Sequence, residues 1–550
     1  MPFKTYLKEY FTSDLKAGFI TAVVALPLAL AFAIASGVPP IMGLYTAIIA
    51  GLLGSLFGGS TYSITGPTGA MTVIILSAVS KFGIEGLLLA GFMAGIIQLF
   101  FSFIKLGRFV KFIPLPVVSG FTAGIGAIIF IGQIANSFGL SIPSKEHVWE
   151  TLWAIMQNLN HISLITIGIT LATILSLMYL PPLLTRIKYL RNLPASLFPL
   201  LVFTTAVIAF HLTIPQVGTI PQGLPAFHRI NFNFQLLQNI LPSAFTIALL
   251  GSIEALLCAV VCDGMTNTKH DSDKELRGQG IANVIMPFFG AMPATAAVAR
   301  SGVNIREGAK TKYAGVIHAL ILLVILLFLA PIAQYIPKAF LAGILMYVSF
   351  RMINLDEFKT IIKISRSETI VLFVTFGLTV LTDLVFAVEI GMVFAVFLLF
   401  IKLTTIMDVT NMVDYQPHEG LNAFVYKNPQ LKDVVTVYTI HGPFFFGAMN
   451  VFEKKINEHI EATKPLIILR MKYVPFIDST AIVRLNEFIK DRKKNNGTVL
   501  IADMTPLVKQ TLLKNKEFTH LVKSKYLFPT TKDALSHVEK NLHHLLLNGN

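Results

Sequence analysis

Hydrophobic positions form long blocks along the chain up to about residue 405 and short periods after it. Each block approaches the roughly 20 apolar residues that a helix needs to cross a bilayer. These blocks predict membrane-spanning helices in two groups separated by a polar stretch. The first group covers 15–36, 41–57, 84–104, 114–136, 162–181 and 195–212, and the second covers 241–262, 278–291, 313–333, 337–350, 368–382 and 387–404.

Two further segments are interrupted by turns. ITGPTGAM (64–71) and MPATAAVARSG (292–302) carry proline and glycine inside apolar regions, and each leads into a short helical pattern, over 64–80 and 292–307. Unpaired N–H groups at an interrupted helix are tolerated at membrane depth only where they line a cavity or bind something. Their positive dipole end favours an anion. The matched positions in the two halves predict an anion site near the bilayer midplane.

With these two segments the chain has fourteen, arranged as seven plus seven in repeats over 15–212 and 241–405. The odd number in each half predicts opposite orientations, which is the design of an inverted repeat. Residues 1–14 read as a cytoplasmic amphipathic lead-in, not as a cleavable signal peptide. The predicted transmembrane domain is 15–405.

The pattern after residue 405 is typical of a small α/β domain. Alternating or short apolar runs predict strands within 433–447, 464–474 and 497–504, and amphipathic patterns predict helices within 480–497 and 506–516. Alternation of strands and helices predicts an α/β fold over 431–545. The preceding stretch 406–430 is predicted to be a linker or the first strand of this domain.

Composition and charge place the chain in a membrane. Hydrophobic residues make up 54% and charged residues 13%, against about 25% charged residues in soluble proteins. The net charge is +14. Because the basic residues concentrate in alternate loops, this charge indicates membrane topology and not nucleic-acid binding. With the N-terminus inside, the inner loops hold the basic residues within 105–111, 186–191, 269–277, 306–312 and 351–366. The outer loops hold only Lys81, Lys145, Arg229 and Lys338.

This distribution predicts a multi-pass protein of the inner membrane with both termini in the cytoplasm. The only cysteines, Cys258 and Cys262, lie in one apolar run and predict neither a disulfide framework nor a metal site. No GxxxxGK[ST] motif is present, which disfavours ATP-driven pumping. We expect no enzyme activity, no cofactor and no nucleic-acid partner.

The sequence resembles the SulP family of anion transporters, which is related to the animal sulfate and anion exchangers and prestin. The resemblance rests on the segment from LPLALAFAIASGVPP to ITGPTGAM (26–71), on HDSDKELRGQG to NIREGAKT (270–311), and on VPFIDSTAI (474–482). The last segment is similar to STAS domains, the fold shared with anti-sigma-factor antagonists. The resemblance implies a uracil-permease-like fold with core and gate domains, a homodimer, and an elevator-like movement of the core.

The resemblance also implies where the anion binds. The implied site lies between the two half-helix starts and includes Phe32 of the first span. Its residues are Gly66, Pro67, Thr68 and Gly69 on one side and Ala297, Val298, Ala299, Arg300 and Ser301 on the other. Leu28 stands where many relatives carry glutamine. The alternative is that these small residues serve close helix packing.

Glu254 and Cys258 are implied to be the coupling-ion positions. A carboxylate at membrane depth is costly and usually functional, although it can also be a structural group held by helix-end N–H groups. Sodium-coupled bicarbonate members of the family carry aspartate and threonine at these two places. A thiol is a poor ligand for a hard cation, which favours proton coupling over sodium coupling. Arg300 is predicted to receive the anion or to pair with Glu254; the alternative is snorkelling to the inner face.

The turn Asp478-Ser479-Thr480 opens a predicted helix of the C-terminal domain. Its ordinary role is helix capping, and the resemblance to anti-sigma-factor antagonists implies regulation by phosphorylation as the alternative. Together these features predict secondary active transport of a small inorganic anion, sulfate first, by proton symport. The alternatives are sodium-coupled bicarbonate or C4-dicarboxylate transport, an anion channel or exchanger, and a sensor that signals to a cytoplasmic partner through the STAS domain.

Overall fold

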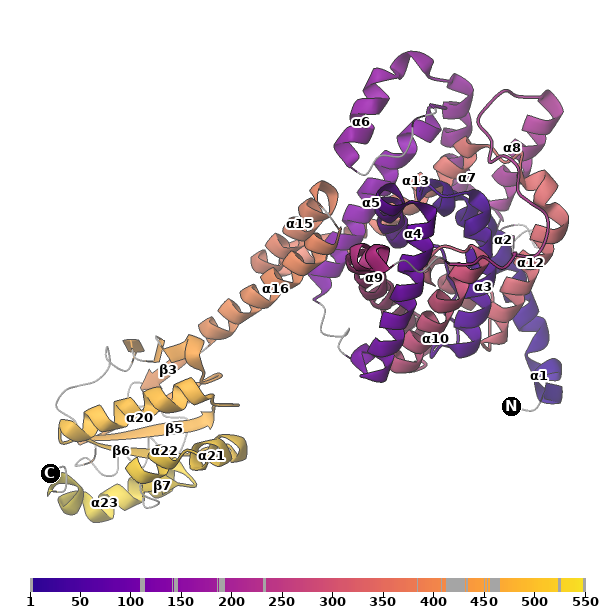
Figure 1. The fold of residues 1–550 in the computed structure, drawn as a ribbon. Coiled ribbons are helices and arrows are strands. Elements are labelled where there is room, and N and C mark those ends of the chain that lie inside the picture. The colour runs from indigo at the N-terminus through magenta and orange to yellow at the C-terminus, as the bar shows by residue number, and fades with distance from the viewer. Residues whose placement is uncertain are drawn as a thin grey trace. The chain divides into compact units, whose positions relative to one another are not determined.

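The computed structural model forms two compact units, Met1–Val393 and Phe394–Asn550, which are described separately (Figure 1). It describes residues 3–108, 114–140, 142, 147–184, 186, 193–230, 234–382, 384–406, 408–411, 431, 434–449, 451–452, 454–455, 465–522 and 526–547. The basic loop residues Lys111, Lys145, Lys188 and Arg191 and most of the predicted linker, 412–430, lie outside this part of the chain.

The first unit consists of helices and a short two-stranded ribbon. Its first half contains α1 (Phe3–Glu9), α2 (Phe11–Ala35), α3 (Pro40–Phe57), α4 (Gly69–Phe103), α5 (Leu115–Ser137), α6 (Val148–Gln157), α7 (Leu164–Leu184) and α8 (Leu197–Phe210). Its second half contains α9 (Phe234–Thr266), α10 (Ser272–Ile285), α11 (Val298–Arg306), α12 (Tyr313–Ala333), α13 (Lys338–Met352), α14 (Leu355–Ile364), α15 (Arg366–Leu381) and the start of α16 (Leu384–Ile406). Among the described residues, eight helical stretches are long and apolar enough to cross a membrane.

The label α4 covers two helices that meet at Gly83, where the backbone is not helical, with φ of 69° and ψ of −174°. The separate segments predicted over 64–80 and 84–104 are therefore both present. Glycine adopts this backbone conformation without the steric cost that other residues would incur. The helices α6 and α14 were not predicted, because short amphipathic segments give no long apolar run.

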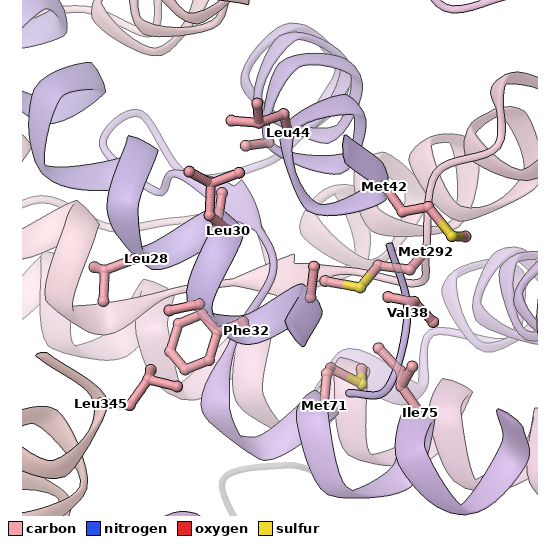
Figure 2. Close-up of a cluster of buried hydrophobic side chains, with 14 of the residues drawn as sticks. Leu28, Leu30, Phe32, Val38, Met42, Leu44, Met71, Ile75, Met292 and Leu345 are labelled. Carbon is pink, nitrogen blue, oxygen red and sulfur yellow. The ribbon is translucent and has the colours of Figure 1, made fainter. Parts of the chain in front are cut away.

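The two sequence halves are interleaved. The helix α4 packs along α9 and α10, α5 packs along α13 and α15, and α12 packs along α2 and α3. Small residues allow this close approach: a Cβ at Gly95 of α4 would lie 2.5 Å from the backbone nitrogen of Val284 in α10. Figure 2 shows the resulting core, in which side chains of α2, α3 and α4 meet Met292 and Leu345 of the second half.

Among the residues described in the second unit, five strands form one sheet in the order β3-β4-β5-β6-β7. The strand β3 (Asp408–Asn411) is antiparallel to β4 (Val435–His441), and β5 (Leu466–Tyr473), β6 (Thr498–Ala502) and β7 (Leu527–Phe528) continue in parallel. Two apolar clusters pack helices against the strands. One cluster contains residues of α20 (Ser479–Lys494), α21 (Pro506–Leu513) and α22 (Lys516–Leu521), and the other contains residues of α23 (Thr531–Leu547). The sheet begins at Asp408, inside the stretch predicted as a linker or first strand.

Candidate functional site

The two interrupted segments meet in a two-stranded ribbon. The strands β1 (Thr65–Gly66) and β2 (Thr295–Ala296) pair antiparallel, with Thr65 opposite Ala296 and Gly66 opposite Thr295. The helix α4 follows β1 and α11 follows β2 after only two residues and one residue, respectively. The short antiparallel ribbon therefore brings two helix N-termini from distant parts of the chain close together. This pairing also satisfies backbone groups that the interruption would leave without partners.

The start of α4 is capped and buried. The Thr68 hydroxyl accepts a hydrogen bond from the Met71 N–H at 3.4 Å and donates to Oε2 of Glu254, on α9, at 2.8 Å. A Cβ at Gly69 would lie 2.9 Å from Ile129 and 3.6 Å from the Phe32 ring. The predicted residues Phe32, Thr68 and Gly69 therefore lie together with Glu254.

Phe32 and Leu28 belong to the same buried cluster. Figure 2 shows both side chains on α2, with Leu345 of α13 beside the Phe32 ring. Phe32 is 5% exposed and Leu28 is 7% exposed. Leucine at position 28 thus gives this wall of the site an apolar surface.

The Arg300 side chain crosses from α11 to β1. It is 1% exposed, and its Nη2 donates to the carbonyl oxygen of Pro67 at 2.5 Å. A Cβ at Gly66 would lie 2.6 Å from Nη1 of Arg300, so only glycine leaves room for the guanidinium here. The buried Nη1 has no hydrogen-bond partner among the described residues. The side chain therefore does not snorkel, and it keeps one free donor beside the ribbon.

The start of α11 is open on its outer side. The cap residue Ala297 has no side chain that could accept a hydrogen bond, and its N–H donates to the Ile64 carbonyl at 3.0 Å. Val298 and Ala299 in the first turn are exposed. The first N–H groups of a helix have no partner within it, so this turn presents donors that a ligand can use.

Ser301 and Cys258 connect the back of α11 to its neighbours. The Ser301 hydroxyl accepts from the Ile64 N–H and donates to the Ala297 carbonyl, both at 2.8 Å. The Cys258 thiol donates to the Ser301 hydroxyl at 3.2 Å and is fully buried. The two predicted coupling residues thus contact different helix starts, Glu254 that of α4 and Cys258 that of α11.

Three polar residues of α10 were not predicted as part of the site. Gln279 donates to the Thr65 hydroxyl and to Glu275, each at 3.0 Å, and Glu275 accepts the N–H groups that precede β1. Asn283 bonds both backbone groups of Ala294, just before β2. Their spacing of four residues places them on one helix face, which is a signal that the sequence does contain.

In the second unit, Asp478 caps α20. Its Oδ1 accepts from the Ala481 N–H at 2.8 Å, and its Oδ2 accepts from the Phe446 N–H at 3.1 Å. Ser479 and Thr480 are exposed. The capping role predicted for this turn is therefore present, and the carboxylate also holds the loop after β4.

Long apolar helices that enclose two interrupted helix starts and a buried arginine define an integral membrane transport protein. The family model described as the sulfate permease family matches residues 11–375, and the STAS domain model matches residues 426–534. The chain belongs to the sulfate permease family, and it is an anion transporter, not an enzyme.

Curated relatives cover nearly the whole chain. The "Putative sulfate transporter YvdB" of Bacillus subtilis is 38% identical over 95% of this chain and 97% of its own length. The bicarbonate transporter BicA of Picosynechococcus is 30% identical over 98% of this chain and 96% of its own length. Similarity thus extends to relatives named for two different anions.

Solved structures show the same fold. The chain matches SLC26A9 with a TM-score of 0.84 and 19% identity, over 98% of this chain and 91% of that chain. The transmembrane domain of a cyanobacterial BicA matches with a TM-score of 0.62 and 33% identity, over 72% of this chain and 98% of that chain. The predicted architecture, a polytopic helical domain followed by a STAS domain, is confirmed.

Proposed function

We propose that the chain is a secondary active transporter of a small inorganic oxyanion and that its main substrate is sulfate. The observation that carries this proposal is the buried Arg300, whose free Nη1 lies beside the ribbon that joins the two helix starts. A guanidinium and helix N–H groups are the donors that bind oxyanions. The name of the Bacillus subtilis relative is consistent with sulfate.

We place proton coupling at Glu254. Its carboxylate accepts a hydrogen bond from the hydroxyl of Thr68, the cap residue of α4, at 2.8 Å. A protonated carboxyl has less acceptor capacity and one donor, so proton binding would alter the cap at one side of the anion site. Charge balance also favours this coupling, because an anion and a proton that enter together carry less net charge through the membrane.

The proposal includes an elevator-like movement of the two helix starts, a homodimer, and an inner-membrane location with cytoplasmic termini. The small-residue contacts between α4 and α10 support rigid movement of the ribbon and its helices as one body. In the STAS domain, the exposed Ser479 and Thr480 beside the Asp478 cap are the candidate regulatory positions, either for phosphorylation or for a cytoplasmic partner.

Sodium-coupled bicarbonate transport is the main alternative, and the relative named as a bicarbonate transporter favours the anion of this alternative. Against it stands Cys258, whose thiol contacts Ser301 and offers a hard cation no oxygen ligand. A C4-dicarboxylate is a further substrate class for the same donors. An anion channel or exchanger is the alternative class, and accumulation against a gradient distinguishes it from a symporter.

The test is uptake by the full chain in proteoliposomes. Labelled sulfate, bicarbonate and succinate are each offered with an inward proton gradient, an inward sodium gradient, or neither. We expect sulfate accumulation only with the proton gradient. Sodium-driven bicarbonate accumulation would replace the proposal by its main alternative, and purely downhill flux would assign the chain to the channel or exchanger class.

A further inference from the structure

The short helix α6 (Val148–Gln157) carries an apolar face that is exposed in the described part of the chain. Trp149 and Trp153 are each 62% exposed, and Leu152 and Met156 are 39% and 63% exposed. Residues three and four apart lie on one side of a helix, so these four side chains form a single stripe. The chain contains only two tryptophans, and both belong to this stripe.

The opposite side of α6 fixes its depth. Ile155 is 5% exposed and belongs to a cluster with Ala135 and Phe138, at the end of α5. The chain returns to the end of α5 after α6. The Ser163 N–H, just before α7 begins, donates to the Phe138 carbonyl at 3.0 Å. Both α5 and α7 are long and apolar enough to cross a membrane. The helix α6 is thus held where two spanning helices end (Figure 1).

We propose that α6 lies in the membrane–water interface with its tryptophan stripe inserted among the lipids. Tryptophan is enriched at this boundary because its ring is apolar while its N–H can bond water or headgroups. An amphipathic helix at this depth buries its apolar face at the headgroup level and leaves its polar face in water. Glu150 and Gln157, near the two ends of α6, lie three and four residues from Trp153 and supply polar side chains along one edge of the stripe.

A second copy of the chain is a weaker candidate for covering the stripe. A stable protein interface buries about 800 Å² on each partner. A buried aromatic side chain contributes about 150–250 Å². At 62% exposure the two tryptophans together have at most about 310 Å² left to bury. Leu152 and Met156 are smaller side chains at 39% and 63% exposure, so the total stays below what such an interface needs. Lipid requires no matching surface and no minimum area.

The two tryptophans make the test direct, because tryptophan emission, excited at a wavelength where the 14 tyrosines do not absorb, comes from α6 alone. The protein is reconstituted in phosphatidylcholine vesicles whose acyl chains carry bromine either near the headgroup or near the chain end. Iodide in the aqueous phase serves as the second quencher. We expect blue-shifted emission, strong quenching by bromine near the headgroup, and weak quenching by iodide and by bromine near the chain end.

A matched control calibrates the depth. In a Trp149→Phe/Trp153→Phe background, Leu175→Trp places one indole on α7, at a position that is 52% exposed within a spanning helix. We expect its strongest quenching from bromine near the chain end. Strong quenching of the native tryptophans by iodide would overturn the proposal. Protection from iodide and from both brominated lipids would also overturn it and would place the stripe in a protein contact.

Discussion

The two helix starts of the site share one ribbon but differ in whether their first N–H groups have hydrogen-bond partners and contact solvent. At α4, the Thr68 side chain caps the helix and bonds Glu254, and the next residue, Gly69, lies close to the side chains of Ile129 and Phe32. At α11, Ala297 provides no cap and the first turn is exposed, while Arg300 of this helix reaches across to the Pro67 carbonyl. We therefore propose different roles for the two helix starts: the start of α11 mainly binds the anion, and the start of α4 mainly couples transport to the proton.

The largest expected effect comes from removing the charge at α11. Arg300→Ala should reduce sulfate uptake by about 10–100-fold, since a hydrogen bond to a charged group contributes about 1.5–3 kcal/mol. Initial uptake rates in proteoliposomes measure this loss. Arg306→Ala is the matched control, because Arg306 is an exposed cation at the other end of the same helix. Similar losses in both variants would refute a specific role for Arg300.

A substitution of Glu254, beside the start of α4, should separate anion binding from proton coupling. Glu254→Gln keeps an oxygen that can accept from the Thr68 hydroxyl but has no titratable group. We expect anion exchange to persist while proton-driven accumulation disappears; one pH unit supports about a tenfold accumulation for each symported proton. The measurement compares counterflow with uptake under a pH gradient. Full pH-driven accumulation in this variant would remove Glu254 from the coupling mechanism.

The ribbon itself can be tested through its glycines. Gly66→Ala would place a Cβ 2.6 Å from Nη1 of Arg300 and should displace the guanidinium. We expect anion affinity to fall by about tenfold, which corresponds to a strain of about 1.4 kcal/mol. Gly302→Ala is the control on α11, because its Cβ would meet no atom closer than 3.9 Å. Ligand-induced shifts in thermal unfolding report the affinities. Unchanged affinity in Gly66→Ala would contradict the close fit of Arg300.

The capping difference can be reversed at each start. Thr68→Val removes the cap of α4 and should destabilise the transport domain by about 1 kcal/mol, while Thr68→Ser should be nearly neutral. Ala297→Ser should do the opposite at α11, because the new hydroxyl would accept the N–H groups that we assign to the anion. We expect Ala297→Ser to raise stability and to weaken sulfate binding together. Tighter binding in Ala297→Ser would argue against an anion at this helix start.

The smallest effect is expected far from the site, in the STAS domain. Asp478→Ala removes the α20 cap and the bond to the Phe446 N–H, at a cost of about 1 kcal/mol in stability. Ser479→Ala should leave stability nearly unchanged because Ser479 is exposed. Thermal unfolding of both full-length variants gives the comparison. A larger loss of stability in Ser479→Ala than in Asp478→Ala would show that the turn is held by different contacts.

Long hydrophobic runs predicted most of the helices. The helices that lack such a run were missed. The long runs of α2, α5 and α12 were predicted within a few residues of their observed ends, because lipid requires about 20 apolar residues in each span. The amphipathic α6 and α14 escaped, since their polar faces interrupt the run. In the STAS domain, β5 and β6 were predicted because a strand buried in a small parallel sheet reads as a short apolar run.

What the sequence by itself determined is therefore local: the membrane spans, the two interrupted segments, the α/β pattern of the C-terminal domain, and the residue types available at the helix starts. Only the tertiary structure decided that Arg300 bonds Pro67, that Glu254 bonds Thr68, and that Cys258 faces Ser301. Each of these contacts joins segments separated by 43 to 233 residues. Local pattern reflects the solvent around one segment, whereas such contacts depend on how interleaved helices pack, and that is a property of the whole fold.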